Sequence, residues 1–190
     1  NAIYDAVGNV AATSQSNNTA ALNDKLAPTI AGMSLATDNT TIAVIFSELV
    51  YNTNGGSGAL EASDFAFSIS GGVATLSSAT PTGISISGNI ITLSIGLSGN
   101  PDGSETLTVV PIENAIYDAA GNVASTTQSN NSVSLNDKTA PTITGVAVAT
   151  DNGTIAVTMS EAIFNTDGGS GALEASDFAF SISGGTASLS

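Results

Sequence analysis

The sequence contains no cysteine, no histidine and no tryptophan, and its two basic residues are Lys25 and Lys138. Without cysteine there is neither a disulfide framework nor a thiol nucleophile. Without histidine, the usual general base and a common transition-metal ligand are missing. Because arginine is also absent, no guanidinium is present to hold an oxyanion in a bidentate grip. We therefore expect that the chain is not an enzyme.

Positive charge is scarce, whereas 16 acidic residues give the chain a formal net charge of −14. This balance disfavours nucleic-acid binding, which relies on lysine and arginine to neutralise phosphates, and adsorption to anionic membranes. The apolar runs are only about as long as a strand, so we expect no direct membrane insertion of this segment. A hydrophobic content of 42% is unlike that of a disordered acidic tail, and it indicates a folded domain with an acidic surface.

The dominant feature that is present is an internal repeat. Residues Asn1–Ser77 return as Asn114–Ser190 at an offset of 113, and 57 of the 77 aligned pairs are identical. The stretch GGSGALEASDFAFSISGG occurs unchanged in both copies. A period of 113 residues is too long for a solenoid unit and has the size of one small domain. The sequence therefore predicts an array of near-identical domains.

The boundaries between repeats are predicted at two similar linkers, LNDKLAPT (Leu22–Thr29) and LNDKTAPT (Leu135–Thr142). Each linker contains a proline just before its last residue, which blocks helix formation and favours extended structure in the residue before it. Division at these linkers predicts three parts: the C-terminal tail of one repeat (1–26), a complete repeat (27–138) and the N-terminal part of the next (139–190).

Within the repeat, short runs rich in β-forming residues alternate with Gly, Asn, Ser and Pro. The runs FAFSIS and ISIS show the period-two alternation of half-buried strands, SGN (Ser87–Asn89) predicts a tight hairpin, and ALEASDF could form one helical turn. So many short strands in about 110 residues predict an all-β fold, an antiparallel sandwich of two sheets. The expected strands are Ile30–Leu35, Thr41–Phe46, Phe65–Ser70, Ala74–Ser78, Ile84–Ser87, Ile90–Ile95, Thr106–Val110 and Ser132–Leu135.

Three stretches together resemble the bacterial immunoglobulin-like repeats of S-layer proteins and large surface adhesins. They are TAPTITGVAVATDNGTIAVTMSEAIF, SDFAFSISGG and ETLTVVPIENAIYDAAGNV, which contain a Pro-Thr opening, a V-x-(F/M)-S-E strand and a late D-x-A/V-G-N turn. The resemblance covers the complete repeat and both partial ones. It implies an immunoglobulin-like sandwich repeated in tandem, an extracellular or cell-surface location and a role as a spacer.

Carboxylates recur at the predicted strand ends, where oxygen ligands for calcium would be needed. If the first two strands run antiparallel, Glu48 and Asp64 come near the linker that carries Asp24, and Asp38 comes near the next linker. Turn chemistry is the alternative explanation, because Asp and Asn side chains commonly bond nearby backbone amides. The candidate calcium ligands are Asp24, Glu48, Asp64, Asp137, Glu161, Asp177, Asp38 and Asp118.

These observations favour a structural repeat of a large exported protein that forms an adhesin stalk or an extracellular filament, stiffened at its linkers by weakly bound calcium. Its expected partners are neighbouring repeats and further copies, associated laterally or end to end. A fibre could also form by strand exchange between copies. Exchange between the two partial repeats alone could not complete a sandwich, because both lack counterparts of residues 78–113. The alternative function is glycan or protein binding through the Gly- and Ser-rich loop Asn52–Ala59, with Asn52, Asn54 and Ser57 as candidate contacts.

Overall fold

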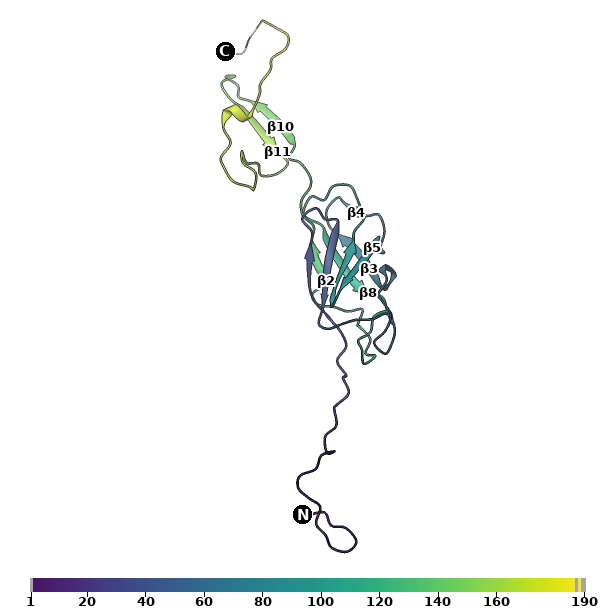
Figure 1. Cartoon of the computed structure of the whole chain (residues 1–190). Coiled ribbons are helices and arrows are strands. Elements are labelled where there is room, and N and C mark those ends of the chain that lie inside the picture. The colour runs from purple at the N-terminus through teal and green to yellow at the C-terminus, as the bar shows by residue number, and fades with distance from the viewer. Residues whose placement is uncertain (1, 187, 189–190) are drawn as a thin grey trace. The chain divides into compact units, whose positions relative to one another are not determined.

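A computed structural model describes residues 2–186 and 188, and its contacts divide the chain into two units, Asn1–Asp137 and Lys138–Ser190 (Figure 1). All the sheets are antiparallel, and among the described residues helix is limited to the short 3₁₀ turns η1 (Ala62–Asp64) and η2 (Ala175–Asp177). The predicted all-β fold class is confirmed. Within the part of the chain that is described, no helix is both long and apolar enough to cross a bilayer.

The first unit contains two main sheets and one small ribbon. The four-stranded sheet has the order β1-β2-β6-β5, the three-stranded sheet has the order β3-β8-β9, and β4 pairs with β7 in the ribbon. The strands are β1 (Ile30–Leu35), β2 (Thr41–Phe46), β3 (Phe65–Ser70), β4 (Thr75–Leu76), β5 (Gly83–Ser87), β6 (Ile90–Ser94), β7 (Leu97–Ser98), β8 (Thr106–Pro111) and β9 (Ser132–Ser134).

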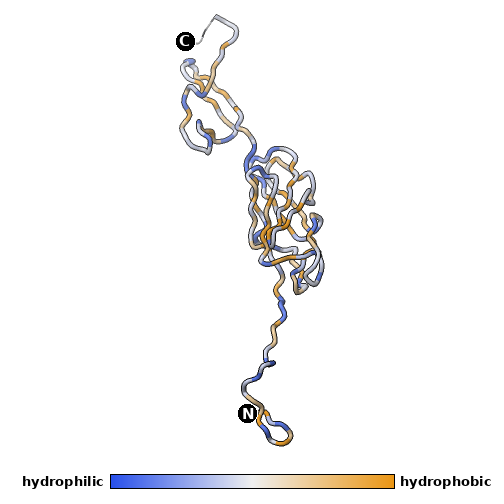
Figure 2. The backbone as a smooth tube through the Cα atoms, viewed as in Figure 1, coloured by the Kyte–Doolittle hydropathy of each residue, from blue (hydrophilic) through white to orange (hydrophobic). Residues whose placement is uncertain are grey.

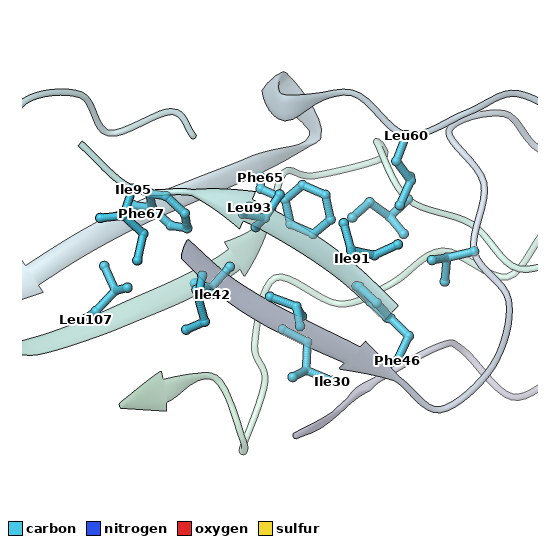
Figure 3. Close-up of a cluster of buried hydrophobic side chains, with 14 of the residues drawn as sticks. Ile30, Ile42, Phe46, Leu60, Phe65, Phe67, Ile91, Leu93, Ile95 and Leu107 are labelled. Atoms are coloured by element: carbon cyan, nitrogen blue, oxygen red, sulfur yellow. The ribbon is translucent and has the colours of Figure 1, made fainter. Parts of the chain in front are cut away.

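Alternating side chains of both main sheets meet in one hydrophobic core, as expected for a sandwich. β2 and β8 bury every second residue, and the rings of Phe46 (β2) and Phe65 (β3) lie 6.3 Å apart between centroids (Figure 3). The segment after β8 adds Ile116, Ala124 and Leu135 to the same core. Burial of this apolar face is the main force that stabilises the unit.

The strand limits agree closely with the sequence-based prediction. The first three expected strands coincide with β1, β2 and β3, and the others differ by a few residues at their ends. The ribbon strand β7 was not predicted, because its two residues follow Gly96 and are too few to show a periodic pattern. The expected helical turn is present as η1.

The described residues of the second unit, 138–186 and 188, repeat the opening of the first. β10 (Ile143–Val148) pairs with β11 (Ile155–Met159), with a register shift between Ile143 and Gly145 that matches the shift between Ile30 and Gly32. Phe178–Ser183, identical in sequence to β3, forms no strand, and apolar side chains such as Val146 and Phe180 are exposed. The tube of Figure 2 shows hydrophobic residues distributed along this unit.

Candidate functional site

Three carboxylates from separate segments converge beside the linker that precedes β1. One oxygen each from Asp24, Glu48 and Asp118 lies within 4.8 Å of the others. Asp24 belongs to the linker before β1, Glu48 follows β2, and Asp118 lies in the turn of the IYDAAGN segment. We call these three residues the acidic cluster.

The Asp118 turn is fixed by its own hydrogen bonds. The backbone N–H and the side-chain amide of Asn122 each donate to one oxygen of Asp118 at 2.7 Å. Burial of Asp118 opposes ionisation, but the bonds from Asn122 and the neighbouring backbone outweigh it, so its pKa is lowered. Asp118 therefore remains a carboxylate at neutral pH.

The same turn forms around exposed Asp5, which shows that it depends on local sequence. Asn9 donates to the Asp5 carboxylate from its backbone at 2.8 Å and from its side chain at 2.7 Å. These hydrogen bonds lower the pKa of Asp5 as well. The turn-chemistry explanation of these aspartates is thus compatible with the geometry at both positions.

Asp24 is held beside this turn by the linker backbone. Its carboxylate accepts the N–H of Leu26 at 2.9 Å, and the carbonyl of Leu26 accepts the side-chain amide of Asn122 at 3.1 Å. Asn122 therefore joins the linker to the Asp118 turn. The linker is further fixed to the end of β2 by a bond from the Ser47 N–H to the Thr29 carbonyl at 2.8 Å.

Glu48 is the member of the acidic cluster whose ionised form is disfavoured by its surroundings. Partial burial raises the pKa of Glu48, and the charges of Asp118 and Asp24 raise it further. A divalent cation among the three groups would remove this repulsion, and carboxylate oxygens are the ligands that calcium prefers. The donor set therefore fits a hard cation.

The other predicted ligands lie outside the acidic cluster. Asp64 caps η1 by accepting the N–H of Glu61 at 2.7 Å, and burial raises its pKa. Asp177 accepts the N–H of Glu174 at 2.8 Å in the corresponding turn η2. Asp38 accepts bonds from the N–H and the hydroxyl of Thr40 at 3.0 and 2.7 Å. The structure thus gives these three aspartates local turn contacts.

The two predicted ligands nearest the second linker fall in different units. Asp137 ends the first unit, where its Cβ would lie 3.3 Å from a Cβ added at Gly103. Glu161 belongs to the second unit and, with Asp177, lines an open hollow of about 570 Å³. By their offset of 113, Asp137 and Glu161 are the counterparts of Asp24 and Glu48.

The Gly- and Ser-rich loop is folded against the Asp118 turn. The Thr53 hydroxyl bonds to Ser57, and Tyr51 exchanges two backbone hydrogen bonds of 2.8 Å with Tyr117. Asn54 is exposed, but its side chain lies over Gly121, where an added Cβ would clash with Asn54 Oδ1. Asn52 is half-buried and fills the space beside Gly58. Close packing of this kind explains why small and polar residues occupy these positions of the loop.

Two polar contacts in the first unit were missed by the sequence reasoning. Glu105 is fully buried and accepts the N–H groups of Val73 and Ala74, each at 2.9 Å. Asn39, also buried, exchanges hydrogen bonds of 2.8 and 2.9 Å with the backbone of Asn136. A signal for Glu105 was available, because it shares the inward register of Leu107 and Val109.

Comparisons with known proteins give little that identifies the chain. No family model matches, and no curated protein matches. A solved structure, the N-terminal part of the bacterial S-layer protein SbsC, aligns with a TM-score of 0.40 and 20% identity. The alignment covers 70% of this chain and 31% of that one, so the chain spans about a third of the S-layer fragment. Similarity at this level identifies neither the fold nor the function of the chain.

Proposed function

We propose that the chain is part of a tandem structural repeat of a large exported protein, and that the repeats form an extended stalk or filament at the cell surface. The observation that carries this proposal is the way in which the linkers meet the first unit. Each linker is hydrogen-bonded to the unit, and the two attachments lie at opposite ends of β1.

The attachment before β1 lies at its first residue. The Thr29 carbonyl accepts the Ser47 N–H, and the Leu26 carbonyl accepts Asn122. The attachment after β9 lies beyond the other end of β1, where Asn39 holds Asn136. Because β1 has six residues, these points are about 20 Å apart. The two linkers of a repeat are therefore separated by about the length of one strand.

Composition supports a mechanical role over a chemical one. The chain has no histidine or cysteine, and 57 of 77 paired positions are identical between the two copies, which suits selection on length more than on a unique site. A net charge of −14 disfavours non-specific association between neighbouring filaments.

Small-angle scattering from chains with one, two and four complete periods tests the spacer role. We expect the maximum dimension to increase by a constant length for each period. Replacing the matched pair Asn39 and Asn136 by alanine in every period should reduce this increment, because the linker is then free to bend. A maximum dimension that rises much less steeply in the unaltered chains would contradict the proposal. Antibody labelling of intact source cells tests the surface location separately.

We further propose that the acidic cluster binds calcium weakly and stiffens the linker, with a dissociation constant of about 10⁻⁴–10⁻³ M as in other extracellular modules. The support is the convergence of Asp24, Glu48 and Asp118 and the raised pKa of Glu48. Calcium would then hold the linker, the end of β2 and the Asp118 turn together.

Thermal unfolding in calcium and in chelator tests this part of the proposal. Calcium at about 10 mM, ten times the weaker dissociation constant, should stabilise the first unit by about 1.4 kcal/mol. Glu48→Gln should abolish most of this gain, whereas Glu113→Gln, on an exposed residue outside the cluster, should retain it. Equal melting temperatures of the unaltered chain in calcium and in chelator would exclude the calcium site.

The sign of the pH dependence in chelator follows from the raised pKa of Glu48. Folding favours the protonated form, so the folded state loses stability as the pH rises from the ordinary glutamate value, about 4.3, through the raised pKa. Glu48→Gln should therefore be the more stable protein above this range, by at most about 1 kcal/mol because solvent screens the partly exposed group.

The glycan-binding role of loop Asn52–Ala59 stays a prediction, because no contact favours it.

A further inference from the structure

The Gly- and Ser-rich loop contains an Asn-Gly pair, Asn54–Gly55, whose chemistry the spacer role does not use. In such a pair the backbone nitrogen of the glycine can attack the side-chain carbonyl carbon of the asparagine, because glycine has no Cβ to obstruct the approach. Both residues are exposed, and a Cβ added at Gly55 would meet no atom within 4 Å. Solvent and the attacking nitrogen therefore both have access to the Asn54 carboxamide.

The two reacting groups of this pair are not held by hydrogen bonds. Among the described residues, neither the carboxamide of Asn54 nor the N–H of Gly55 has a hydrogen-bond partner. Other asparagines of the first unit differ in this respect. The carboxamides of Asn89 and Asn131, for example, donate to backbone carbonyls at 2.7 and 2.9 Å. Asn54 can therefore turn toward the Gly55 nitrogen without breaking a hydrogen bond.

The other Asn-Gly pair of the sequence, Asn152–Gly153, differs at the attacking nitrogen. The N–H of Gly153 donates to Asp151 Oδ1 at 2.9 Å. This bond to a charged acceptor must break before the nitrogen can attack. The two pairs have the same two side chains, so the hydrogen bond of Gly153 is what distinguishes their reactivity.

The second copy of the loop already contains the residue that this reaction would produce. By the offset of 113, Asp167 is the counterpart of Asn54. Both copies of the loop are closed by the same threonine-to-serine hydrogen bond. Their glycines also agree, with φ of 104° at Gly55 and 91° at Gly168. An aspartate is therefore compatible with the folded conformation of this loop.

We propose that Asn54 deamidates spontaneously in the folded chain and that the loop remains folded afterwards. The Gly55 nitrogen forms a bond to Asn54 Cγ, its proton passes to the side-chain NH₂ group, and ammonia leaves, which closes a cyclic imide. Water then adds to one of the two imide carbonyls and opens the ring. Opening on the side-chain side gives aspartate, and opening on the main-chain side gives isoaspartate. Either product replaces a neutral amide by a carboxylate.

The reaction adds a negative charge against the turn that carries Asp118. Asn54 Oδ1 lies so close to Gly121 that a Cβ there would clash with it, and the Gly121 N–H donates to the Asp118 carbonyl at 3.3 Å. The chain, with a net charge of −14, becomes more negative by one charge. The loop of the first copy then has the same charge at this position as the loop of the second.

Peptide mapping after incubation of the folded 190-residue chain at mildly basic pH tests the proposal. Trypsin cuts only after Lys25 and Lys138, so the two Asn-Gly pairs fall in separate peptides. In water enriched in heavy oxygen, we expect aspartate and isoaspartate at Asn54, each with one heavy oxygen atom. Asn152 should convert about tenfold more slowly, because the nitrogen of Gly153 must first leave its hydrogen bond. Equal rates at the two sites, or no conversion at Asn54 while the denatured chain converts, would overturn the proposal.

Three variants test the chemistry and the product separately. Asn54→Gln, whose longer side chain closes a ring much less readily, should show no conversion at this position. Asp151→Ala frees the N–H of Gly153 and should speed conversion of Asn152 by about tenfold. Asn54→Asp should elute with the aged native chain in anion exchange and shift the melting temperature by less than about 4 °C. An unchanged rate in Asp151→Ala, or a much larger loss of stability in Asn54→Asp, would refute the proposed reaction or its folded product.

Discussion

At the scale of single residues, Glu105 places a fully buried carboxylate in the first unit. It accepts the N–H groups of Val73 and Ala74, and the N–H of Asp102 approaches it at 3.1 Å. Burial opposes ionisation, but these hydrogen bonds outweigh it and lower the pKa of Glu105. The carboxylate replaces the strand partner that the backbone between β3 and β4 would otherwise lack.

Glu105→Gln should destabilise the first unit by about 1.5–3 kcal/mol, because the hydrogen bonds that backbone amides donate to a charged acceptor are replaced by weaker bonds to a neutral one. Glu113→Gln, on an exposed residue of the same chain, should change the stability by less than about 0.5 kcal/mol. Chemical denaturation followed by tyrosine fluorescence measures both values. Similar stabilities for the two variants would contradict the structural role of Glu105.

The pH dependence of this effect has a definite sign. Because the pKa of Glu105 is lowered by folding, its contribution is fully present above the ordinary glutamate value, about 4.3, and is lost as the pH falls through the lowered pKa. The difference between the native chain and Glu105→Gln should therefore shrink in acid. Sequence alone did not predict this role, because its partners Val73 and Ala74 come from a turn some 30 residues earlier.

At the scale of elements, the same six-residue sequence forms a strand in one copy and not in the other. FAFSIS forms β3 at Phe65–Ser70 but no strand at Phe178–Ser183. β3 pairs along its whole length with β8, whereas among the described residues no strand pairs with Phe178–Ser183. A strand depends on its neighbour for hydrogen bonds and burial, so alternation in the sequence predicts the capacity to form a strand and not the strand itself. The sequence predicted the limits of β1, β2 and β3 well, because their partners are present.

The matched pair Phe67 and Phe180 measures how much the covering strands contribute. Phe67 is 4% exposed, whereas Phe180, in the identical local sequence, is 53% exposed. Phe67→Ala should cost about 3–5 kcal/mol, as for other large-to-small core substitutions. Phe180→Ala should cost less than about 0.5 kcal/mol of the stability of either unit. Comparable losses would mean that the second unit has a core of its own in solution.

The Asn39 turn offers a second matched pair, with Asn152. Both residues have positive φ, but Asn39 is buried and bonded to Asn136, whereas Asn152 is exposed. Glycine accepts positive φ without strain, so Asn39→Gly isolates the hydrogen bonds. It should destabilise the first unit by about 1–3 kcal/mol, and Asn152→Gly should have little effect on the melting curve. A small effect of Asn39→Gly would show that the second linker is not held by this pair.

At the scale of the whole molecule, the acidic cluster illustrates what strand direction can and cannot predict. The antiparallel course of β1 and β2 places Glu48 beside the linker that carries Asp24, as the sequence indicated. The third member, Asp118, is 70 residues further along the chain than Glu48. The backbone pair Tyr51–Tyr117 and the bond from Asn122 to the Leu26 carbonyl hold its turn there. Asp64 was expected beside the same linker but instead caps η1, since a carboxylate at a helical turn finds backbone donors locally.

The excess of negative charge should limit the stability of the folded chain as a whole. With a net charge of −14, self-repulsion is greater in the compact state than in the unfolded one. Raising sodium chloride from about 10 to 150 mM shortens the Debye length from about 30 to 8 Å, so the melting temperature in chelator should rise. A gain of about 1 kcal/mol would raise it by roughly 4 °C. Tetramethylammonium chloride should act equally well, because screening needs no specific site. A rise with sodium alone would point to cation binding, and a fall with both salts would show that attractive charge pairs dominate.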